Sequence, residues 1–235
     1  MTCSHCGAEH VVEIIAGVNA ASEPELKARI KDGSAFVTEC PFCGYRSLVS
    51  GQLLYHDPSE RVMVWLLPEG VALSGQQQNL VSSSVPGLEN YTLRRVLSAG
   101  EMIEKVNIFD AGLDDRVMEL CKHVTRMELA EGGAPGEVSG SAGAQSGVST
   151  PAGVIGSAGA PGKPEVFGAD MKFFRMDGAD NTIIFSFPHE SKMQLVEVGF
   201  NVYEDCRGIL ARNPSIKEDT GFALVDADWV ARFFG

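Results

Sequence analysis

The sequence predicts an α+β protein in which antiparallel strands with an inserted helix precede a helical hairpin, a flexible linker and a small α/β segment. Three observations support this prediction. Two Cys-x-x-Cys-Gly units stand at residues 3–7 and 40–44, and short β-branched runs alternate with capped helical segments around and after them. Residues 132–164 are dominated by Gly, Ala, Ser and Pro, a composition that cannot bury enough apolar surface to fold.

The elements expected before residue 98 follow from short apolar runs and from helix-capping residues. Ser22 would cap the first helix at its start, and Gly33 would end it in a left-handed conformation. Residues 70–90 are rich in Ser, Gln and Gly and are expected to be mostly loop. The expected helix lies at residues 23–32, and the expected strands lie at 11–18, 35–38, 47–55, 61–67 and 91–97.

A helical hairpin is expected next. Ser98 and Glu101 form a capping-box pattern, in which Glu101 reaches back to the N–H of Ser98, and this helix runs to about Phe109. Gly112 would end it, and Asp114 would cap the following helix. The second helix carries an apolar stripe at spacings of three and four residues, formed by Val117, Leu120, Cys121, Val124 and Met127.

Ordinary patterning resumes after the linker. Residues 177–181 predict the turn of a hairpin, and residues 201–212 predict an amphipathic helix. Asp226 or Asp228 would begin a terminal helix that ends at Phe234. The expected strands lie at residues 171–176, 182–187 and 195–198.

The two cysteine units together provide a complete ligand set for a metal ion. In each unit the glycine permits the positive φ that completes the turn. Four thiolates are the tetrahedral set that Zn²⁺ prefers, and a closed set leaves no position for water or substrate, so we expect one structural zinc ion. Iron is the alternative, because a site with four thiolates can also hold a single iron. The predicted ligands are Cys3, Cys6, Cys40 and Cys43.

Two other interpretations of these units have less support. A Cys-x-x-Cys pair can exchange disulfides when its first thiol is activated at a helix N-terminus, but neither pair here clearly precedes a helix. His5 and His10 could replace a thiolate or shield the metal. With four cysteines available, we expect both imidazoles to be solvated or to lie outside the ligand set.

The remaining cysteines and histidines have simpler explanations. Cys121 and His123 are two residues apart on a helix, so their side chains face apart and do not form a ligand pair. Cys121 and Cys206 are each expected in the core as small buried side chains. His189 follows a proline at a strand end and has no base or nucleophile partner visible in the sequence.

No catalytic constellation stands out in the sequence. Asp110, Asp114 and Asp115 could form a carboxylate cluster, but their positions at a helix end and a helix start explain them as caps. No phosphate-binding glycine loop, nucleophile elbow or zinc-protease motif is present. We therefore expect a non-enzymatic protein, with an enzyme that carries an unrecognised site as one alternative.

Composition limits the partners and the compartment. The 235 residues are 44% hydrophobic and carry a net charge of -12, which weighs against binding to the phosphate backbone of nucleic acid. The first residues lack the basic and apolar regions of a signal peptide, and the apolar runs are too short to span a membrane. We therefore expect a cytoplasmic protein. Six cysteines in such a chain indicate metal binding more often than disulfides. The expected partner is a protein.

Residues 1–129 and, more loosely, the C-terminal segment resemble the CpXC family of bacteria and archaea, which is named for its cysteine motifs. The second unit, Cys40-Pro41-Phe42-Cys43, matches the motif, whereas the first has Ser4 where the family usually has proline. That difference affects the stiffness of the turn and not the thiolates. Residues 104–117 are also similar to the helical region of the family. The resemblance implies metal binding and leaves the cellular role open.

Three parts of the chain are predicted from these patterns. Residues 1–130 are predicted to form a CpXC-like, zinc-binding domain that resembles a zinc ribbon. Residues 131–165 would be a disordered linker, and residues 166–235 a small α/β segment. About 70 residues are marginal for an independent core, so we expect the last segment to pack on the first domain. We expect the protein to serve as a protein–protein interaction module, with a transcription-linked, nucleic-acid-binding zinc ribbon as a further alternative.

Overall fold

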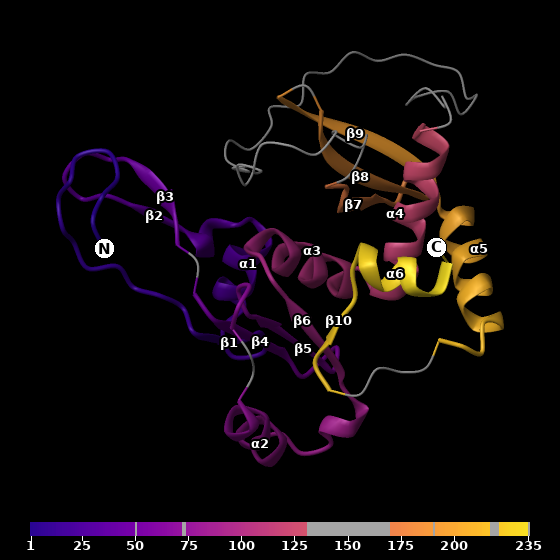
Figure 1. The fold of residues 1–235 in the computed structure, drawn as a ribbon, viewed down its shortest axis with the longest axis horizontal. Coiled ribbons are helices and arrows are strands. Elements are labelled where there is room, and N and C mark those ends of the chain that lie inside the picture. Colours follow the sequence, from indigo (N-terminus) through magenta and orange to yellow (C-terminus); the bar gives the residue numbers. More distant parts are fainter. Residues whose placement is uncertain (50, 72–73, 131–169, 190, 217–220, 235) are drawn as a thin grey trace.

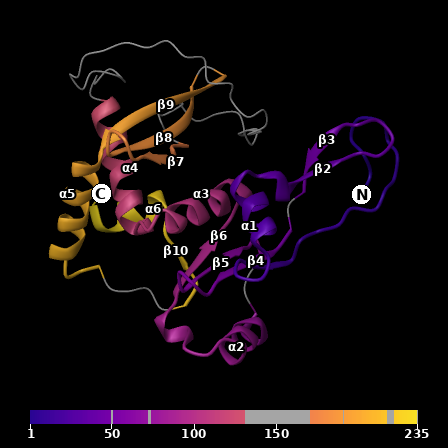
Figure 2. The same ribbon diagram turned by 180° about the vertical axis from the view of Figure 1, so that it is seen from behind.

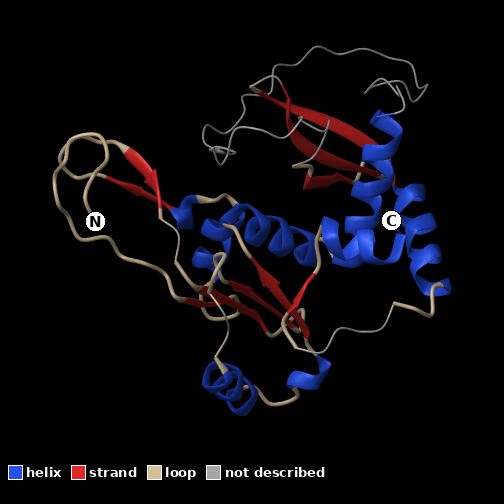
Figure 3. Cartoon of the chain, viewed as in Figure 1, coloured by secondary structure: helices blue, strands red, loops and turns tan. Residues whose placement is uncertain are grey.

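The computed structural model describes residues 1–49, 51–71, 74–130, 170–189, 191–216 and 221–234. Over these residues the chain is a mixed α/β structure with a five-stranded, a three-stranded and a two-stranded sheet (Figures 1 and 3). The two-stranded sheet and the N-terminus lie on an arm, residues 1–16 and 37–49, that extends from the larger body (Figures 1 and 2). No helix in the described part of the chain is long and apolar enough to cross a lipid bilayer.

The main sheet has the strand order β1-β4-β5-β6-β10. Antiparallel pairing, which the sequence predicted throughout, holds in this sheet only for the β4/β5 hairpin, and the other neighbours pair in parallel. The connections after β1, β5 and β6 are long, so they can return the chain in the same direction. The strands are β1 (Gly17–Asn19), β4 (Leu53–Asp57), β5 (Val62–Leu66), β6 (Thr92–Val96) and β10 (Ala223–Leu224).

The central strand β5 is buried on both faces of the main sheet. Because successive side chains point to opposite faces, Val64 and Leu66 join one apolar cluster, and Met63 and Trp65 join another. Helices α1 and α3 cover the first face, and α2 lies on the other side of the sheet (Figure 1). These helices are α1 (Pro24–Lys31), α2 (Gly75–Ser84) and α3 (Ala99–Asp110).

The prediction that residues 70–90 are mostly loop is wrong, because this stretch contains α2. Ser74 and Gln77 form a complete capping box: the Ser74 Oγ accepts from the Gln77 N–H at 3.2 Å, and the Gln77 Oε1 accepts from the Ser74 N–H at 3.0 Å. The helix has a weak apolar stripe and buries Val81, so hydrophobic periodicity does not reveal it. The spacing of Ser74 and Gln77, which is that of a capping box, is the sequence signal that could have predicted this helix.

The caps predicted for α3 and α4 (Asp115–Ala130) are confirmed. The Ser98 Oγ accepts from the Glu101 N–H at 3.2 Å, although the Glu101 carboxylate accepts from the Leu97 N–H and not from Ser98. Gly112 has a φ of 70°, and the Asp114 carboxylate accepts from the second N–H of α4. The expected antiparallel hairpin is wrong, since α4 turns away from α3 toward the three-stranded sheet (Figures 1 and 2).

The three-stranded sheet is antiparallel, with the order β7-β8-β9, and the hairpin predicted for its first two strands is confirmed. Its apolar face and two helices share one core with Ile108, Val117 and Met118 of the earlier helices. Met127, expected in the buried stripe of α4, is 51% exposed. The predicted linker, residues 131–165, lies outside the described residues. The elements are β7 (Lys172–Asp177), β8 (Thr182–His189), β9 (Lys192–Gly199), α5 (Phe200–Arg212) and α6 (Ala227–Phe234).

Asp226 is the residue that caps α6, because its carboxylate accepts from the Trp229 N–H at 2.8 Å. Upstream, Ala223 of β10 pairs with Arg94 of β6, so the chain near its end adds an edge strand to the main sheet. The last part of the chain therefore contacts the first part both through a shared core and through a strand pair. The division of the chain into domains at residues 130 and 165 stays a prediction.

The arm departs from the sequence prediction in its local structure. The strand expected at 11–18 is reduced to β1, because residues 11–15 pair with no other strand of the described chain and Val11 is 97% exposed. Residues 34–36 form a 3-10 turn before β2, and Glu23, not Ser22, occupies the N-cap position of α1. The two strands of the arm are β2 (Val37–Glu39) and β3 (Arg46–Leu48), which pair antiparallel.

Candidate metal centre and buried charges

The two cysteine turns have the same backbone geometry. In each turn the carbonyl of the first cysteine accepts from the glycine N–H at 2.9 Å, from Gly7 to Cys3 and from Gly44 to Cys40. Both glycines take the predicted positive φ, 74° and 70°. The N–H of the first cysteine donates at 2.9 Å to the residue after the glycine in each turn, which closes the loop. Two equivalent turns thus present four sulfurs.

The four sulfurs meet at the end of the arm. The Sγ atoms of Cys3 and Cys43 are 3.7 Å apart, those of Cys6 and Cys40 are 3.8 Å apart, and all four lie within 4.8 Å of one another. Four sulfurs at about 2.3 Å from a central Zn²⁺ would be about 3.8 Å from each other in a tetrahedron. The cluster therefore has the size of a four-thiolate metal site.

Backbone N–H groups in the first cysteine turn favour a negatively charged sulfur on Cys3. The N–H groups of Cys6 and His5 lower the pKa of the Cys3 thiol to about 6, which favours its thiolate form. The N–H of Tyr45 lowers the pKa of Cys43, but burial and the neighbouring thiols outweigh it and raise that pKa to about 12. A divalent cation would stabilise all four thiolates, because metal binding displaces thiol protons.

The histidines of the arm lie outside the sulfur cluster. His5 stacks on Tyr45 with ring centroids 5.3 Å apart and an interplanar angle of 11°, so one aromatic contact joins the two turns. The main chain of His10 pairs with Met1, which fastens the N-terminus to the arm. Among the described residues, the group able to hold a metal ion consists of the four cysteines.

Cys121 and Cys206 are buried, as predicted, and contact each other across α4 and α5. The hydrogen bond from the neighbouring thiol and burial raise the pKa of Cys121 far above its ordinary value. His123 is partly exposed on α4, and burial lowers its pKa. His189 ends β8 opposite Lys192 of β9. None of these four residues approaches the sulfur cluster at the end of the arm.

The three aspartates considered as a carboxylate cluster do not converge. Asp110 pairs with Lys27 at 2.7 Å, and Lys27 also reaches Asp57 at 3.0 Å, which ties α1 to α3 and β4. Asp114 caps α4 and pairs with Arg116 at 2.8 Å. Of the three predicted caps, Asp114 acts as one, whereas Asp110 and Asp115 are held by ion pairs.

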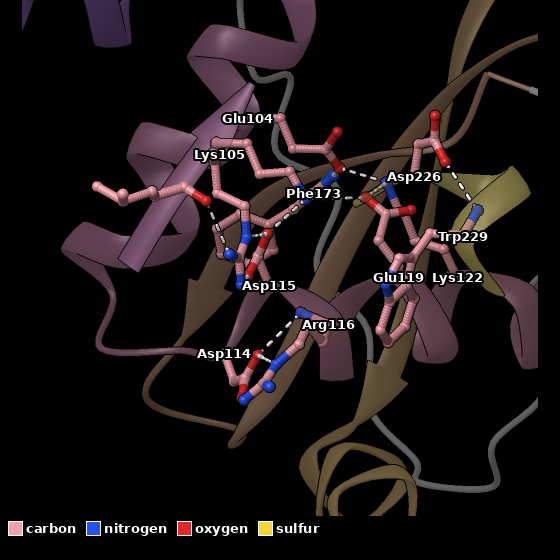
Figure 4. A network of polar contacts seen from close by, with 12 residues as sticks. Glu104, Lys105, Asp114, Asp115, Arg116, Glu119, Lys122, Phe173, Asp226 and Trp229 are labelled. Carbon is pink, nitrogen blue, oxygen red and sulfur yellow. Dashed lines mark hydrogen bonds and ion pairs between the residues drawn. The ribbon is translucent and has the colours of Figure 1, made fainter. Parts of the chain in front are cut away.

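Asp115 belongs instead to a chain of buried charges that the sequence did not predict (Figure 4). Three cationic and three anionic side chains alternate along it, and every one of these residues is at most 8% exposed. They come from β6, α3 and α4, and their formal charges cancel. In order of contact they are Arg94, Asp115, Lys105, Glu119, Lys122 and Glu104.

The contacts within this chain are short and well directed. Arg94 donates to both oxygens of Asp115, at 2.8 and 2.9 Å, and Lys105 lies 2.8 Å from the same carboxylate. Lys122 lies 2.8 Å from Glu119 and joins it to the last acid of the chain. Burial alone would raise the pKa of Asp115, but Lys105 and Arg94 hold it well below its usual range. The Asp115 carboxylate can therefore remain ionised inside the protein.

Glu104 links the chain of charges to the three-stranded sheet. Its Oε1 accepts from the Phe173 N–H of β7 at 2.7 Å and from Lys122 at 2.9 Å (Figure 4). Its Oε2 lies 3.6 Å from Lys172. Burial opposes ionisation, but the nearby lysines lower the pKa of Glu104. Its carboxylate thus joins α3 and α4 to a strand far along the sequence, and this contact has no local sequence signal.

Comparison with known proteins gives one family match. A family model described as CpXC protein matches residues 1–122, about half of the chain. The match includes both cysteine turns and ends at Lys122, so it contains all six buried charges but not the three-stranded sheet. We find no significant match among curated proteins or solved structures.

Neutralising Glu104 should strongly destabilise the fold. Glu104→Gln keeps the shape of the side chain but leaves the buried chain with one uncompensated positive charge. Breaking a buried ion pair in this way costs about 3 to 5 kcal/mol, which we expect as a loss in the free energy of unfolding in urea. Glu128→Gln, an exposed change on α4, should alter it by less than about 0.5 kcal/mol. Equal effects of the two changes would contradict the role assigned to Glu104.

The same carboxylates predict a pH dependence of stability. The pKa values of Glu104 and Asp115 are lower in the folded than in the unfolded chain. Their stabilisation is therefore fully present above the unfolded pKa, about 4, and is lost progressively as the pH falls from there through the lower folded pKa. The free energy of unfolding should therefore decrease from about pH 5 downward. The decrease should be less steep in Glu104→Gln than in Glu128→Gln, and parallel curves for the two variants would refute this contribution.

Proposed function

The chain belongs to the CpXC protein family, and from that premise we propose that its four clustered cysteines bind one structural zinc ion in a non-enzymatic protein-interaction module. The observation that carries the metal proposal is the close approach of the four sulfurs, all within 4.8 Å of one another, with Cys3–Cys43 and Cys6–Cys40 at 3.7 and 3.8 Å. Cys3, Cys6, Cys40 and Cys43 would be the ligands. A complete set of four thiolates leaves no position for substrate.

Zinc would replace an apolar core in the arm. Cys3 and Cys40 are buried, whereas most other side chains of residues 1–16 and 37–49 are exposed. Apparent binding free energies of about 10 to 16 kcal/mol for structural zinc are large enough to fold such a segment. Iron is the alternative metal for the same ligands. A redox role finds less support, because an extended chain or strand, and not a helix, follows each cysteine turn.

The interaction role rests on the exposed surface of the arm. Phe42, between the second pair of cysteines, is 68% exposed, and the nearby Tyr45 and Leu48 are 43% and 48% exposed. Exposed aromatic side chains on a projecting, cross-linked element are suited to contact another protein. The net charge of -12 disfavours the alternative of a nucleic-acid-binding zinc ribbon. An enzyme with an unrecognised site is the other alternative.

Metal analysis tests the zinc proposal. The purified protein should contain one zinc per chain, and Cys40→Ser should lose the metal and unfold the arm, because three ligands no longer close the tetrahedron. Elemental analysis together with limited proteolysis measures both effects. Cys206→Ser changes the same residue type away from the cluster and should keep the zinc. A metal-free protein that folds and oxidises its cysteines reversibly would refute the structural site.

Affinity capture tests the interaction role. Tagged wild-type protein should recover a specific protein partner from its native cells, and Phe42→Ser should lose that partner while it retains zinc, because the aromatic contact is outside the ligand set. Leu80→Ser, a change at a 64% exposed side chain on α2, is the control and should retain it. Salt-sensitive recovery of DNA or RNA would favour the nucleic-acid alternative. Substrate turnover that is lost in Asp114→Asn would favour the enzyme.

A further inference from the structure

A groove of about 480 Å³ lies at the base of the arm. One side is formed by residues 13–17, which lead into β1, and the other by residues 35–39, which include all of β2. Three consecutive residues of β2 line the groove although alternate side chains of a strand point to opposite faces. The groove therefore runs along the backbone edge of β2. Its volume is within the range of sites that bind ligands.

The hydrogen-bond register shows which backbone groups of β2 face this edge. The Phe36 carbonyl accepts from the Val49 N–H, and the Cys40 N–H donates to the Tyr45 carbonyl, both at 2.9 Å. Between these two bonds, Thr38 is the residue whose backbone groups pair with β3. The backbone groups of the two residues beside Thr38 must point the opposite way, because hydrogen-bonding direction alternates along an antiparallel strand.

Three backbone groups are consequently available on the free edge. The Val37 N–H donates to the Ser34 carbonyl in the preceding turn, but the Val37 carbonyl and both polar groups of Glu39 have no backbone partner within the described chain. Two acceptors and one donor at this spacing can pair with the backbone donors and acceptor of an added strand. Unpaired edges of this kind are templates for strand addition.

The side chains around the groove define the chemistry of its occupant. Glu13 and Glu39 are exposed at its rim, opposed by a single cation, Arg29. Its interior includes the buried side chains of Phe36 and Leu53. The site therefore combines an apolar interior, an acidic rim and an unpaired strand edge. An extended segment with alternating basic and apolar side chains complements all three.

We propose that this groove binds an extended basic segment of a partner protein, which adds as a third strand to the free edge of β2. The inference rests on the proposed interaction function and assigns it a surface and a partner chemistry. A second copy of the chain is a poorer occupant, because pairing two β2 edges would bring the acidic rims of two molecules together. The metal cluster would hold β2 in place, since Cys40 directly follows this strand.

Peptide binding to the full-length, zinc-loaded protein tests this inference. The probe is a fluorescein-labelled, acetylated octapeptide of alternating Lys and Val, followed by fluorescence anisotropy. The double variant Glu13→Lys and Glu39→Lys should weaken binding at least about tenfold, because two attractive contacts become repulsive. Glu69→Lys together with Glu89→Lys is the matched pair of charge reversals at exposed positions away from the groove, and it should bind the peptide at least about threefold more tightly than the Glu13/Glu39 variant.

Two further peptides test whether a strand is added. One is N-methylated at its Val residues and the other at its Lys residues, so each blocks the amides on one edge of the peptide. Only one edge would face β2, and one isomer should therefore bind like the parent while the other loses binding. Equal binding by the two isomers would refute strand addition. No binding of the parent at millimolar concentration, or equal binding of an alternating Glu and Val peptide, would refute the basic partner.

Zinc content and sedimentation, measured on the same samples, separate the possible failures. Loss of peptide binding in a variant that keeps its zinc supports the groove. Sedimentation as a dimer that the peptide does not dissociate would overturn the proposal in favour of a second copy as the occupant. Capture of a native partner that is unaffected by the double variant would refute the groove but leave the proposed interaction function standing.

Discussion

Six buried charges in alternating order hold the two larger sheets in one arrangement. Each charged group loses several kcal/mol of hydration when it is buried, so it must meet opposite charges or hydrogen-bond donors at short range. Arg94 on β6, Asp115 on α4 and Lys105 on α3 satisfy one another, and none of these elements can shift without exposing an unpaired charge. The last acid, Glu104, is completed by the Phe173 N–H. The three-stranded sheet therefore supplies a hydrogen-bond donor to the buried charges, all six of which lie within residues 1–122.

The arm is stabilised by a different principle. It contributes few buried apolar side chains, and two glycine turns, one aromatic stack and the backbone bonds of β2 and β3 define its shape. A metal ion bound by the four sulfurs would cross-link the N-terminus to the segment that follows β2. This would leave the surface of the arm free for recognition, because its stability would not require its side chains to be buried. The proposed groove lies where this cross-linked element meets the main sheet.

Local signals predicted the helices and turns of the body where a capping residue and a periodic apolar pattern agreed. Ser98, Gly112 and Asp114 act as expected, because a cap depends on atoms within a few residues. The strand expected at 11–18 does not form over most of its length, since a strand also needs a neighbour. The stretch 70–90, expected to be loop, contains α2. A capping box stabilises the start of this helix, and its mostly polar sequence shows no clear apolar periodicity.

By itself, the sequence determined the four cysteines, their spacing and the glycine turns that aim them, because a Cys-x-x-Cys-Gly turn is a local structure. Only the tertiary structure brought the sulfurs to within 4.8 Å, since 34 residues separate Cys6 from Cys40. It also decided the parallel pairing of the main sheet, the buried partners of Glu104 and the unpaired edge of β2. These features depend on contacts between distant segments, and such contacts are set by which surfaces and charges can be buried together.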